Sequence, residues 1–366
     1  MTVADAALFG GVFHTTAVNN SHAELRALAD EIGSRAFTER LGKRQRPEQF
    51  DSALWQHLED TGLARLTSTP DPDAGPAELA VVLYSLARRA GAVPLAETDL
   101  LAAWLGQQAS LALPADGPMT VGIATECSMT NAITGTALGV PWSRTATAVV
   151  MVARSAHRAY VGTIGQSEAE IIDDHNLAGE PRDSITFEVP LNRLQALDSA
   201  IYDELVIRGA WARCIQVVGA LDAAAESSVA HCRERVQFGR PLSRLQAVQH
   251  SLAMMAGEIE KGRAATELAI AAACDHGFSS AQTRYAVTAA KVVLGRISEA
   301  VVTTAHQLHG AIGVTLEHPL WLATTRSQSW IREFGSTNHY AAELGRLALN
   351  AREPWEVLTG EAIRCV

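Results

Sequence analysis

The feature that most constrains the fold is a set of long helical periodicities in the second half of the chain. Apolar residues recur every three or four positions from Ile207 to Leu221, and again with near-heptad spacing from Val287 to Leu308. A third stretch between them, from Leu252 to Ala273, is rich in alanine and methionine. Long helices with short connections predict a four-helix-type bundle. Because its faces are apolar on several sides, we also expect a partner chain to cover part of it.

The first half of the chain shows two other sequence patterns. Residues 23–107 follow a helical periodicity, which a loop rich in proline and aspartate interrupts at residues 68–76. Residues 119–194 instead contain short β-branched runs separated by Gly, Asn, Asp and Pro, which predicts a small antiparallel β-domain. The expected runs are Thr120–Ala124, Ala148–Val152, Ala159–Gly162 and Ile185–Val189.

The expected fold class is therefore mainly α with a small β-domain. We expect an N-terminal helical domain over residues 1–115, a middle antiparallel β-domain over residues 116–197 and a C-terminal four-helix bundle over residues 198–366.

Composition excludes several classes of function. The chain has 366 residues and a net charge of −10 at pH 7, which argues against a nucleic-acid partner because nucleic-acid-binding domains are usually basic. Its five cysteines show no CxxC spacing, as expected in a reducing compartment. No apolar stretch reaches the length of a membrane span, and the first residues do not read as a secretory signal. We therefore expect a cytoplasmic protein without membrane insertion.

Two motifs in the helical half combine charged, amide, aromatic and glycine residues. The first lies at the turn between the first two long helices and reads Arg233-Glu234-Arg235-Val236-Gln237-Phe238-Gly239-Arg240-Pro241-Leu242, followed by Leu245-Gln246-Ala247. The second follows the near-heptad stretch and reads Gln307-Leu308-His309-Gly310-Ala311-Ile312-Gly313. With a helical block and a β-domain before them, these motifs make the chain resemble the acyl-CoA dehydrogenase family.

The resemblance implies FAD as the cofactor, held at a subunit interface, and an acyl-CoA as the substrate. Arg235 matches an arginine that meets the pyrophosphate, for which a guanidinium offers paired donors that lysine lacks. The resemblance assigns further contacts on the pyrophosphate and adenosine side to Gln237, Phe238, Gln246, Gln307, Leu308, His309, Gly310 and Ala311. A simpler reading of each motif stays open: arginines favour a helix C-terminus through the macrodipole, and glycine ends helices.

The chain departs from the family pattern where the flavin ring and the thioester would bind. The family's β-domain opens with Thr-Glu-Pro and a Gly-Ser-Asp signature, whereas residues 125–130 read Thr-Glu-Cys-Ser-Met-Thr. The position of the family's flavin-shielding tryptophan falls at Gly139, although Trp142 is near.

The catalytic base is also missing from its usual place. Phe334 occupies the position of the catalytic glutamate, and Glu333, one residue earlier, is rotated from it by about 100° on a helix. An alternative position of the family's base falls near Gly209–Ala210 and offers no carboxylate. We therefore expect no catalytic residue in this chain, with Glu333 as the fallback.

This combination resembles the smaller, non-catalytic chain of heteromeric α2β2 acyl-CoA dehydrogenases of actinobacteria, which act on steroid-CoA or other bulky acyl-CoA thioesters. A catalytic α-type subunit would then be the partner. Two alternatives stay open. One is a self-sufficient homotetrameric flavoenzyme with Glu333, Glu126 or Asp203 as its base, and the other is a non-enzymatic interaction protein on the same scaffold.

His309 is the one imidazole inside the two motifs. A lone histidine beside glycines is more often packed than catalytic, and His250, His306 and His318 form no metal-ligand spacing with it. The sequence therefore predicts no metal site.

Overall fold

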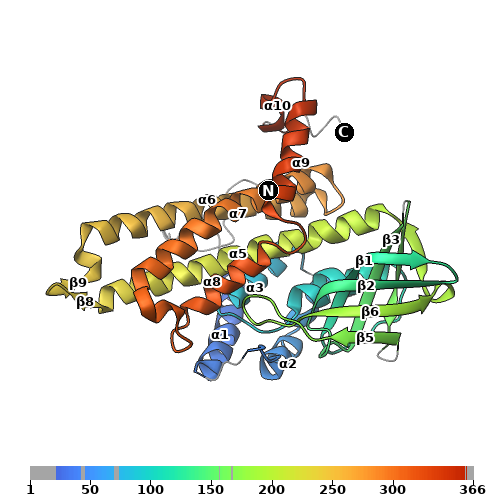
Figure 1. The fold of residues 1–366 in the computed structure, drawn as a ribbon, viewed down its shortest axis with the longest axis horizontal. Coiled ribbons are helices and arrows are strands. Elements are labelled where there is room, and N and C mark those ends of the chain that lie inside the picture. Colours follow the sequence, from blue (N-terminus) through green and yellow to red (C-terminus); the bar gives the residue numbers. More distant parts are fainter. Residues whose placement is uncertain are drawn as a thin grey trace. The chain divides into compact units, whose positions relative to one another are not determined.

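The computed structural model describes residues 22–42, 46–69, 74–155, 157–165, 168–358 and 360 (Figure 1). The chain divides into two compact units. Unit 1 comprises Met1–Lys43, Pro76–Ala90 and Ala210–Val366, and unit 2 comprises Arg44–Gly75 and Gly91–Gly209. The expected class, mainly α with a small β-domain, is confirmed. The domain boundaries at residues 115 and 197 stay a prediction.

Unit 2 contains a seven-stranded sheet in the order β5-β6-β2-β1-β3-β4-β7 (Figure 1). The strands are β1 (Met119–Met129), β2 (Ala132–Pro141), β3 (Ala148–Ser155), β4 (Arg158–Ile164), β5 (Ala169–Ile172), β6 (Arg182–Pro190) and β7 (Gln195–Asp198). The four β-branched runs fall in β1, β3, β4 and β6, as expected. The other three strands were not predicted, because β2 is rich in glycine and threonine and the remaining two are short.

The expectation of a purely antiparallel sheet was wrong at one pairing. β1 pairs with β2 as an antiparallel neighbour, but β3 lies on the other side of β1 and pairs with it in parallel, with Val121 opposite Val150. The reason is the path of the chain. After β2 reverses the direction of β1, β3 reverses it again and therefore runs with β1. Inward-facing side chains such as Ile133, Met151 and Phe187 form the core of this sheet.

Helical segments complete unit 2, namely α2 (Ser52–Asp60), a buried π-helical segment (Ala96–Ala103) and α4 (Trp104–Gln108). The π-helical segment is joined to β1 by two hydrogen bonds. Thr98 Oγ1 donates to the carbonyl of Met119 at 3.0 Å and accepts from its amide at 2.9 Å. The neighbouring Asp99 carboxylate accepts from the amide and hydroxyl of Thr67. These contacts fix the start of the sheet.

Unit 1 is built from helices. They are α1 (Ala23–Arg40), α3 (Pro76–Arg88), the larger part of α5 (Ala200–Glu234), α6 (Gln246–His276), α7 (Ala281–His309), α8 (Leu320–Trp330), α9 (Thr337–Asn350) and α10 (Trp355–Leu358). The faces predicted from periodicity are buried, including Trp211 and Ile215 on α5 and Leu294 and Ile297 on α7. Trp211 joins α5 to α6, since its indole Nε1 donates to the carbonyl of Ala269 at 3.2 Å.

A buried polar network ties three helices of unit 1 together. Arg263 on α6 donates through Nη2 to both oxygens of Asp222 on α5, at 2.8 and 2.7 Å. Tyr84 on α3 donates its hydroxyl to the same carboxylate at 2.6 Å. Charge-assisted bonds of this kind are directional, and removing one partner would leave a buried charge unpaired. The network therefore specifies how α3, α5 and α6 pack.

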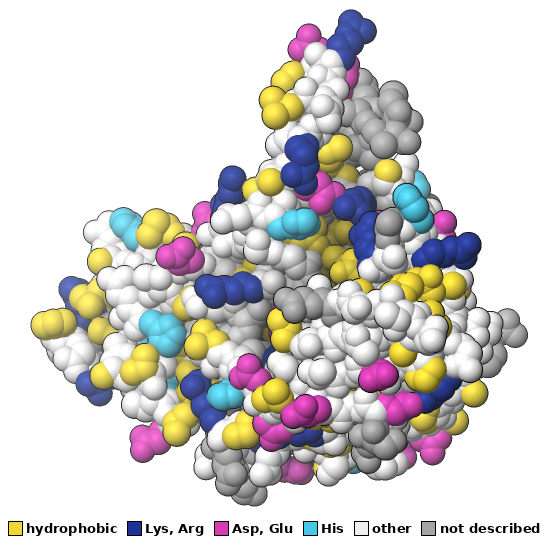
Figure 2. All heavy atoms as spheres, turned by 45° about the vertical axis from the view of Figure 1, so that its right-hand side comes forward, with side chains coloured by type: hydrophobic (Ala, Val, Ile, Leu, Met, Phe, Trp, Pro, Cys, Tyr) yellow, Lys and Arg dark blue, Asp and Glu magenta, His cyan; other side chains and the backbone are white. Residues whose placement is uncertain are grey.

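Among the described residues, no helix combines the length and the apolar character that crossing a bilayer would require. On the face shown in Figure 2, basic and acidic side chains are interspersed rather than separated by sign.

Candidate functional site

The first motif forms an exposed hairpin between α5 and α6. α5 ends at Glu234, and the two short strands β8 (Val236–Gln237) and β9 (Arg240–Pro241) pair with each other (Figure 1). Phe238 and Gly239 form the turn with φ angles of 51° and 74°. Positive φ at both central residues is typical of the tight turns that fit a β-hairpin. The Phe238 side chain is 86% exposed, so the hairpin presents an aromatic ring to solvent.

Four arginines lie on or beside this hairpin. Arg235 and Arg240 lie on it, with Arg233 just before it and Arg244 just after it, and all four side chains are exposed. Within the described part of the chain, none of these guanidinium groups forms an ion pair. In a chain of net charge −10, this is a local concentration of free positive charge. Such a group of guanidinium groups can bind an anion with two phosphates.

The second motif lies at the C-terminal end of α7. Gly310 caps this helix with a φ angle of 63°, which confirms the simpler, structural reading of that glycine. Gln307, Gly310 and Ala311 are exposed, Leu308 is half-buried and His309 is buried.

The structure brings the two motifs together through histidine. The His309 ring stacks on His231 with 4.6 Å between the ring centroids. His231 in turn accepts, through its backbone carbonyl, a hydrogen bond from the amide of Arg235 at 2.8 Å. The exposed Gln246 begins α6, on the other side of the hairpin. The ends of α5 and α7 therefore carry the predicted cofactor residues as neighbours.

The turn that would carry the catalytic base is held by buried basic and hydroxyl groups. Glu333 accepts a hydrogen bond through Oε2 from Nε of Arg213 at 2.7 Å. Arg213 is only 2% exposed, and Nη1 of the same guanidinium donates to Gln216. The half-buried Glu333 carboxylate is therefore engaged in an ion pair with a buried arginine and does not stand free as a proton acceptor.

Phe334 is held in the same turn. It has a φ angle of 54°, its carbonyl accepts from the hydroxyl of Tyr340 at 2.6 Å, and its ring lies 5.6 Å from the guanidinium of Arg213. The buried ammonium of Lys291 donates to the carbonyls of Ile331 and Glu333 at 2.6 and 2.8 Å. Burial lowers the pKa of Lys291 to about 8. Several independent contacts therefore hold the backbone of residues 331–334 in one conformation.

A groove of about 470 Å³ adjoins this turn. Its described lining includes Ile331, Arg332 and Ser336 but neither Glu333 nor Phe334. No candidate base at this turn therefore faces the groove.

The other two candidate bases from the sequence are Asp203 and Glu126. Asp203 pairs with Arg154, with 2.8 Å between Oδ1 and Nη1. The side chain of Glu126 lies outside the described residues. Gly209 and Ala210 are buried inside α5, so this stretch offers no carboxylate, as expected.

In unit 2, a broad groove of about 1040 Å³ runs over β1, β2, β5 and β6. Its lining includes Cys127 and Ser128, which belong to the stretch 125–130 where the family pattern is lost. Three glutamates also line it, Glu168, Glu170 and Glu188, and its described lining contains no basic residue. Glu168 is paired with Arg193, so Glu170 and Glu188 are the acidic side chains that would repel the phosphates of a dinucleotide or of coenzyme A there.

Trp142 does not serve as an exposed ring beside this groove. It is 3% exposed, has a φ angle of 52° and packs edge-on against Phe50 with 6.2 Å between centroids. It is a core residue of unit 2.

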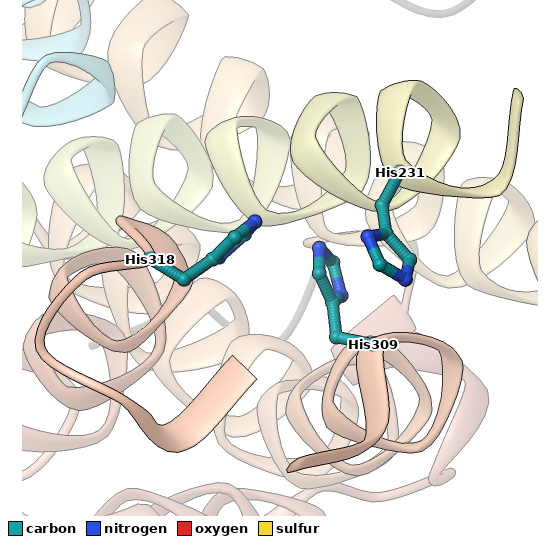
Figure 3. A group of neighbouring side chains, drawn as sticks. All are labelled: His231, His309 and His318. Carbon is teal, nitrogen blue, oxygen red and sulfur yellow. The ribbon is translucent and has the colours of Figure 1, made fainter. Parts of the chain in front are cut away.

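One cluster was missed from the sequence. His309 is not alone, because His231 and His318 lie beside it (Figure 3). The candidate residues from the sequence did not include His231. Its position one helical turn before Arg235 could have placed it near the second motif.

The chain is similar to known acyl-CoA dehydrogenases in part of its sequence and in its fold. Residues 205–339 match the family model described as "Acyl-CoA dehydrogenase, C-terminal domain". The probable acyl-CoA dehydrogenase FadE2 of Mycobacterium tuberculosis is 36% identical over 107 residues, which cover 29% of this chain and 26% of FadE2. The aligned stretch is thus well under two thirds of that relative's length.

Solved structures match over nearly the whole chain. The ChsE4-ChsE5 complex from Mycobacterium tuberculosis has a TM-score of 0.78 at 20% identity and covers 92% of this chain and 100% of the matched one. A variant of the Tcur3481-Tcur3483 steroid ACAD has a TM-score of 0.79 at 24% identity, covering 89% and 97%. A glutaryl-CoA dehydrogenase from Mycobacterium smegmatis in complex with FADH2 has a TM-score of 0.74 at 13% identity, covering 91% and 95%. At these identities the structures establish the fold.

Residues 205–339 of this chain are thus similar to the C-terminal domain of acyl-CoA dehydrogenases, and the chain as a whole shares the fold of solved acyl-CoA dehydrogenases.

Proposed function

We propose that this chain is an FAD-binding subunit of a heteromeric acyl-CoA dehydrogenase, in which a partner chain supplies the catalytic base. The observation that carries the proposal is the ion pair of Glu333 with the buried Arg213, beside a phenylalanine at the position of the base. General-base catalysis needs a carboxylate within reach of the substrate proton. A carboxylate engaged by a buried guanidinium is stabilised in its charged form and is a poor proton acceptor.

The cofactor side of the proposal rests on the hairpin. FAD, when bound, accepts the hydride that leaves the β-carbon of the thioester. Its pyrophosphate carries two negative charges, and the unpaired guanidinium of Arg235 on the exposed hairpin fits that need. Phe238, at the tip of the same hairpin, offers an aromatic face to the adenosine. Gln237, Gln246 and the segment Gln307–Ala311 would complete this side of the site.

The groove of unit 2 supports the proposal that the partner chain, and not this one, binds the flavin ring and the substrate. Its described lining holds no basic residue to meet the phosphates of an acyl-CoA, and Glu170 and Glu188 add negative charge. The partner, a catalytic α-type subunit, would then bind the flavin ring and the substrate.

The substrate class and the assembly follow from resemblance and are proposed with the rest. The neighbour named as a steroid ACAD pairs two differently named components. A steroid-CoA or another bulky acyl-CoA is the substrate that we propose for the assembled heterotetramer, which would work in the cytoplasm.

The test is a flavin count. Purified alone, the chain should carry little FAD, because half of each site would be absent. Co-purified with its α-type partner, it should give a yellow complex with one FAD per heterodimer. Stoichiometric FAD on the isolated chain, together with dye reduction by an acyl-CoA, would instead identify a self-sufficient homotetramer. A colourless complex would favour an interaction protein without flavin.

A further inference from the structure

Three imidazoles from three separate elements converge in unit 1 (Figure 3). His231 lies in the last turn of α5, His309 is the last residue of α7, and His318 lies two residues before α8. One ring nitrogen from each lies within 4.8 Å of the others. His318 meets the His309 ring edge-on, with 4.7 Å between the two centroids. His309 and His318 are nine residues apart, whereas His231 precedes His309 by 78 residues, so the fold brings His231 to the other two.

The hydrogen bonds of His309 leave one nitrogen available as a ligand. Nδ1 lies 2.7 Å from the carbonyl oxygen of Ala305. A carbonyl can only accept, so Nδ1 carries the proton and Nε2 keeps its lone pair. Nε2 lies 3.3 Å from Oγ of Ser227, a contact long enough to be replaced. A backbone carbonyl behind a histidine is also what fixes the ring of a metal-bound imidazole.

The described residues place no carboxylate inside the cluster that would pair with an imidazolium. Nδ1 of His318 accepts a hydrogen bond from the amide of Leu320 at 3.2 Å, so Nε2 is the nitrogen that this ring could offer to a shared ion. Within the described part of the chain, the cluster therefore brings together three imidazoles and no acidic group that would compete for them.

We propose that His231, His309 and His318 bind one divalent d-block ion, of which Zn²⁺ is the representative. Imidazole is a preferred ligand of Zn²⁺, Cu²⁺ and Ni²⁺, and three histidines with one open position are an established arrangement for zinc. The open position would take water or an anion. His309 is also among the residues assigned above to the adenosine side of the flavin site, but the metal inference is argued from the geometry of the three imidazoles alone.

The ligand atoms need a modest rearrangement. With Zn–N bonds of about 2.0–2.1 Å, the ligating nitrogens around a tetrahedral ion lie about 3.3 Å from one another. In the structure, the distances between the three candidate nitrogens reach up to 4.8 Å. His231 and His309 are stacked with 24° between their planes, so one ring must tilt to aim its lone pair at a shared ion. Ligation by Nε2 of His318 would also break the hydrogen bond of 3.2 Å that its Nδ1 accepts from the amide of Leu320.

The experiment uses the full-length chain, or its complex with the partner, stripped with a chelator and left without added FAD. Zn²⁺ is titrated by calorimetry and Co²⁺ by visible absorption. We expect one Zn²⁺ per chain and the intense bands of tetrahedral Co²⁺. Replacing any one histidine, in His231→Gln, His309→Gln or His318→Gln, should weaken Zn²⁺ binding by more than the roughly 10–100-fold that loss of an outer-shell partner causes. His250→Gln, an exposed histidine on α6, is the matched control and should bind normally.

A second measurement covers variants that fail to fold. X-ray absorption of the Zn²⁺-loaded unmodified chain should show three imidazole ligands. Absence of binding, fewer than three imidazoles, or equal affinity in folded cluster variants and in His250→Gln would overturn the proposal. The flavin count of the preceding section does not enter either result, so the two proposals can fail separately.

Discussion

Glu333 and Arg213 form an ion pair between residues that are far apart in the sequence, with 2.7 Å between Oε2 and Nε and with the arginine almost fully buried. Lys291 and Tyr340 hold the backbone of the same turn. The carboxylate nearest to the expected position of the base is thus part of the packing of α5 against residues 331–334.

Glu333→Gln should therefore act on stability and not on chemistry. Loss of the charged partner of a buried arginine should lower the free energy of unfolding by about 1–3 kcal/mol. Turnover by the assembled complex, normalised to folded protein, should stay within a few-fold of the unmodified rate. Denaturant titration and dye-coupled assays measure the two effects. Glu299→Gln, an exposed change on α7, is the control for both. A loss of about 10²–10⁴-fold, typical of a missing general base, would identify Glu333 as catalytic and favour the homotetramer.

Phe334→Glu should not create an active site in this chain. The residue has a φ angle of 54°, and its ring lies 5.6 Å from the guanidinium of Arg213. A carboxylate introduced there would pair with that guanidinium or compete with Glu333 for it, instead of facing a substrate. We expect no dehydrogenation by the isolated variant in a dye-reduction assay with a panel of acyl-CoA thioesters. Measurable turnover would show that the chain itself holds the flavin ring and the thioester.

Arg235→Ala should weaken FAD binding to the assembled complex without unfolding the chain. A lost guanidinium–phosphate contact costs about 1.5–3 kcal/mol, which corresponds to roughly a ten- to hundredfold loss of affinity. Arg235→Lys should recover part of it, because an ammonium keeps the charge but not the paired donors. Reconstitution of the apo-complex followed by flavin fluorescence measures the affinity.

Arg296→Ala is the matched control for Arg235→Ala. Arg296 lies on α7 about 20 Å along the helix from His309. Its replacement removes the same charge away from the hairpin and should leave FAD affinity unchanged. Equal affinity in both variants would show that the hairpin does not contact the cofactor.

Glu267 on α6 should make stability depend on pH in the acidic range. Burial, and then Glu260, raise the pKa of Glu267 to about 7, against the opposing effect of Arg263. Between the ordinary pKa of about 4.3 and pH 7, the folded chain keeps a proton that the unfolded chain has lost. The contribution of this residue to stability is thus present below about pH 4.3 and is lost as pH rises through 7.

Glu267→Gln should remove that dependence. Relative to the unmodified chain, the variant should gain about 1–3 kcal/mol of unfolding free energy between pH 4 and pH 8. Urea titrations at several pH values measure the difference, with Glu299→Gln as the control for a surface carboxylate. A difference between the two chains that is constant over this range would place the carboxyl group of Glu267 in solvent.

The sequence by itself determined the helices, most of the long strands and the buried faces. The spacing of Trp211, Ile215, Leu294 and Ile297 placed these side chains in the core, and the structure buries all of them. Such patterns are local, because the apolar face of a helix or strand is set by residues a few positions apart. The exposed turn at Phe238 and Gly239 likewise lies where the first motif predicted a break between helices.

Only the tertiary structure decided which distant elements meet. It set β3 parallel to β1, paired Glu333 with Arg213, and gathered His231, His309 and His318 from three elements. The spacing of residues along the chain does not predict these contacts, because they depend on how the helices and strands pack in the tertiary fold. The same reason explains why the sequence showed Phe334 at the position of the base, whereas the ion pair of its neighbour Glu333 with a distant, buried arginine could not be predicted.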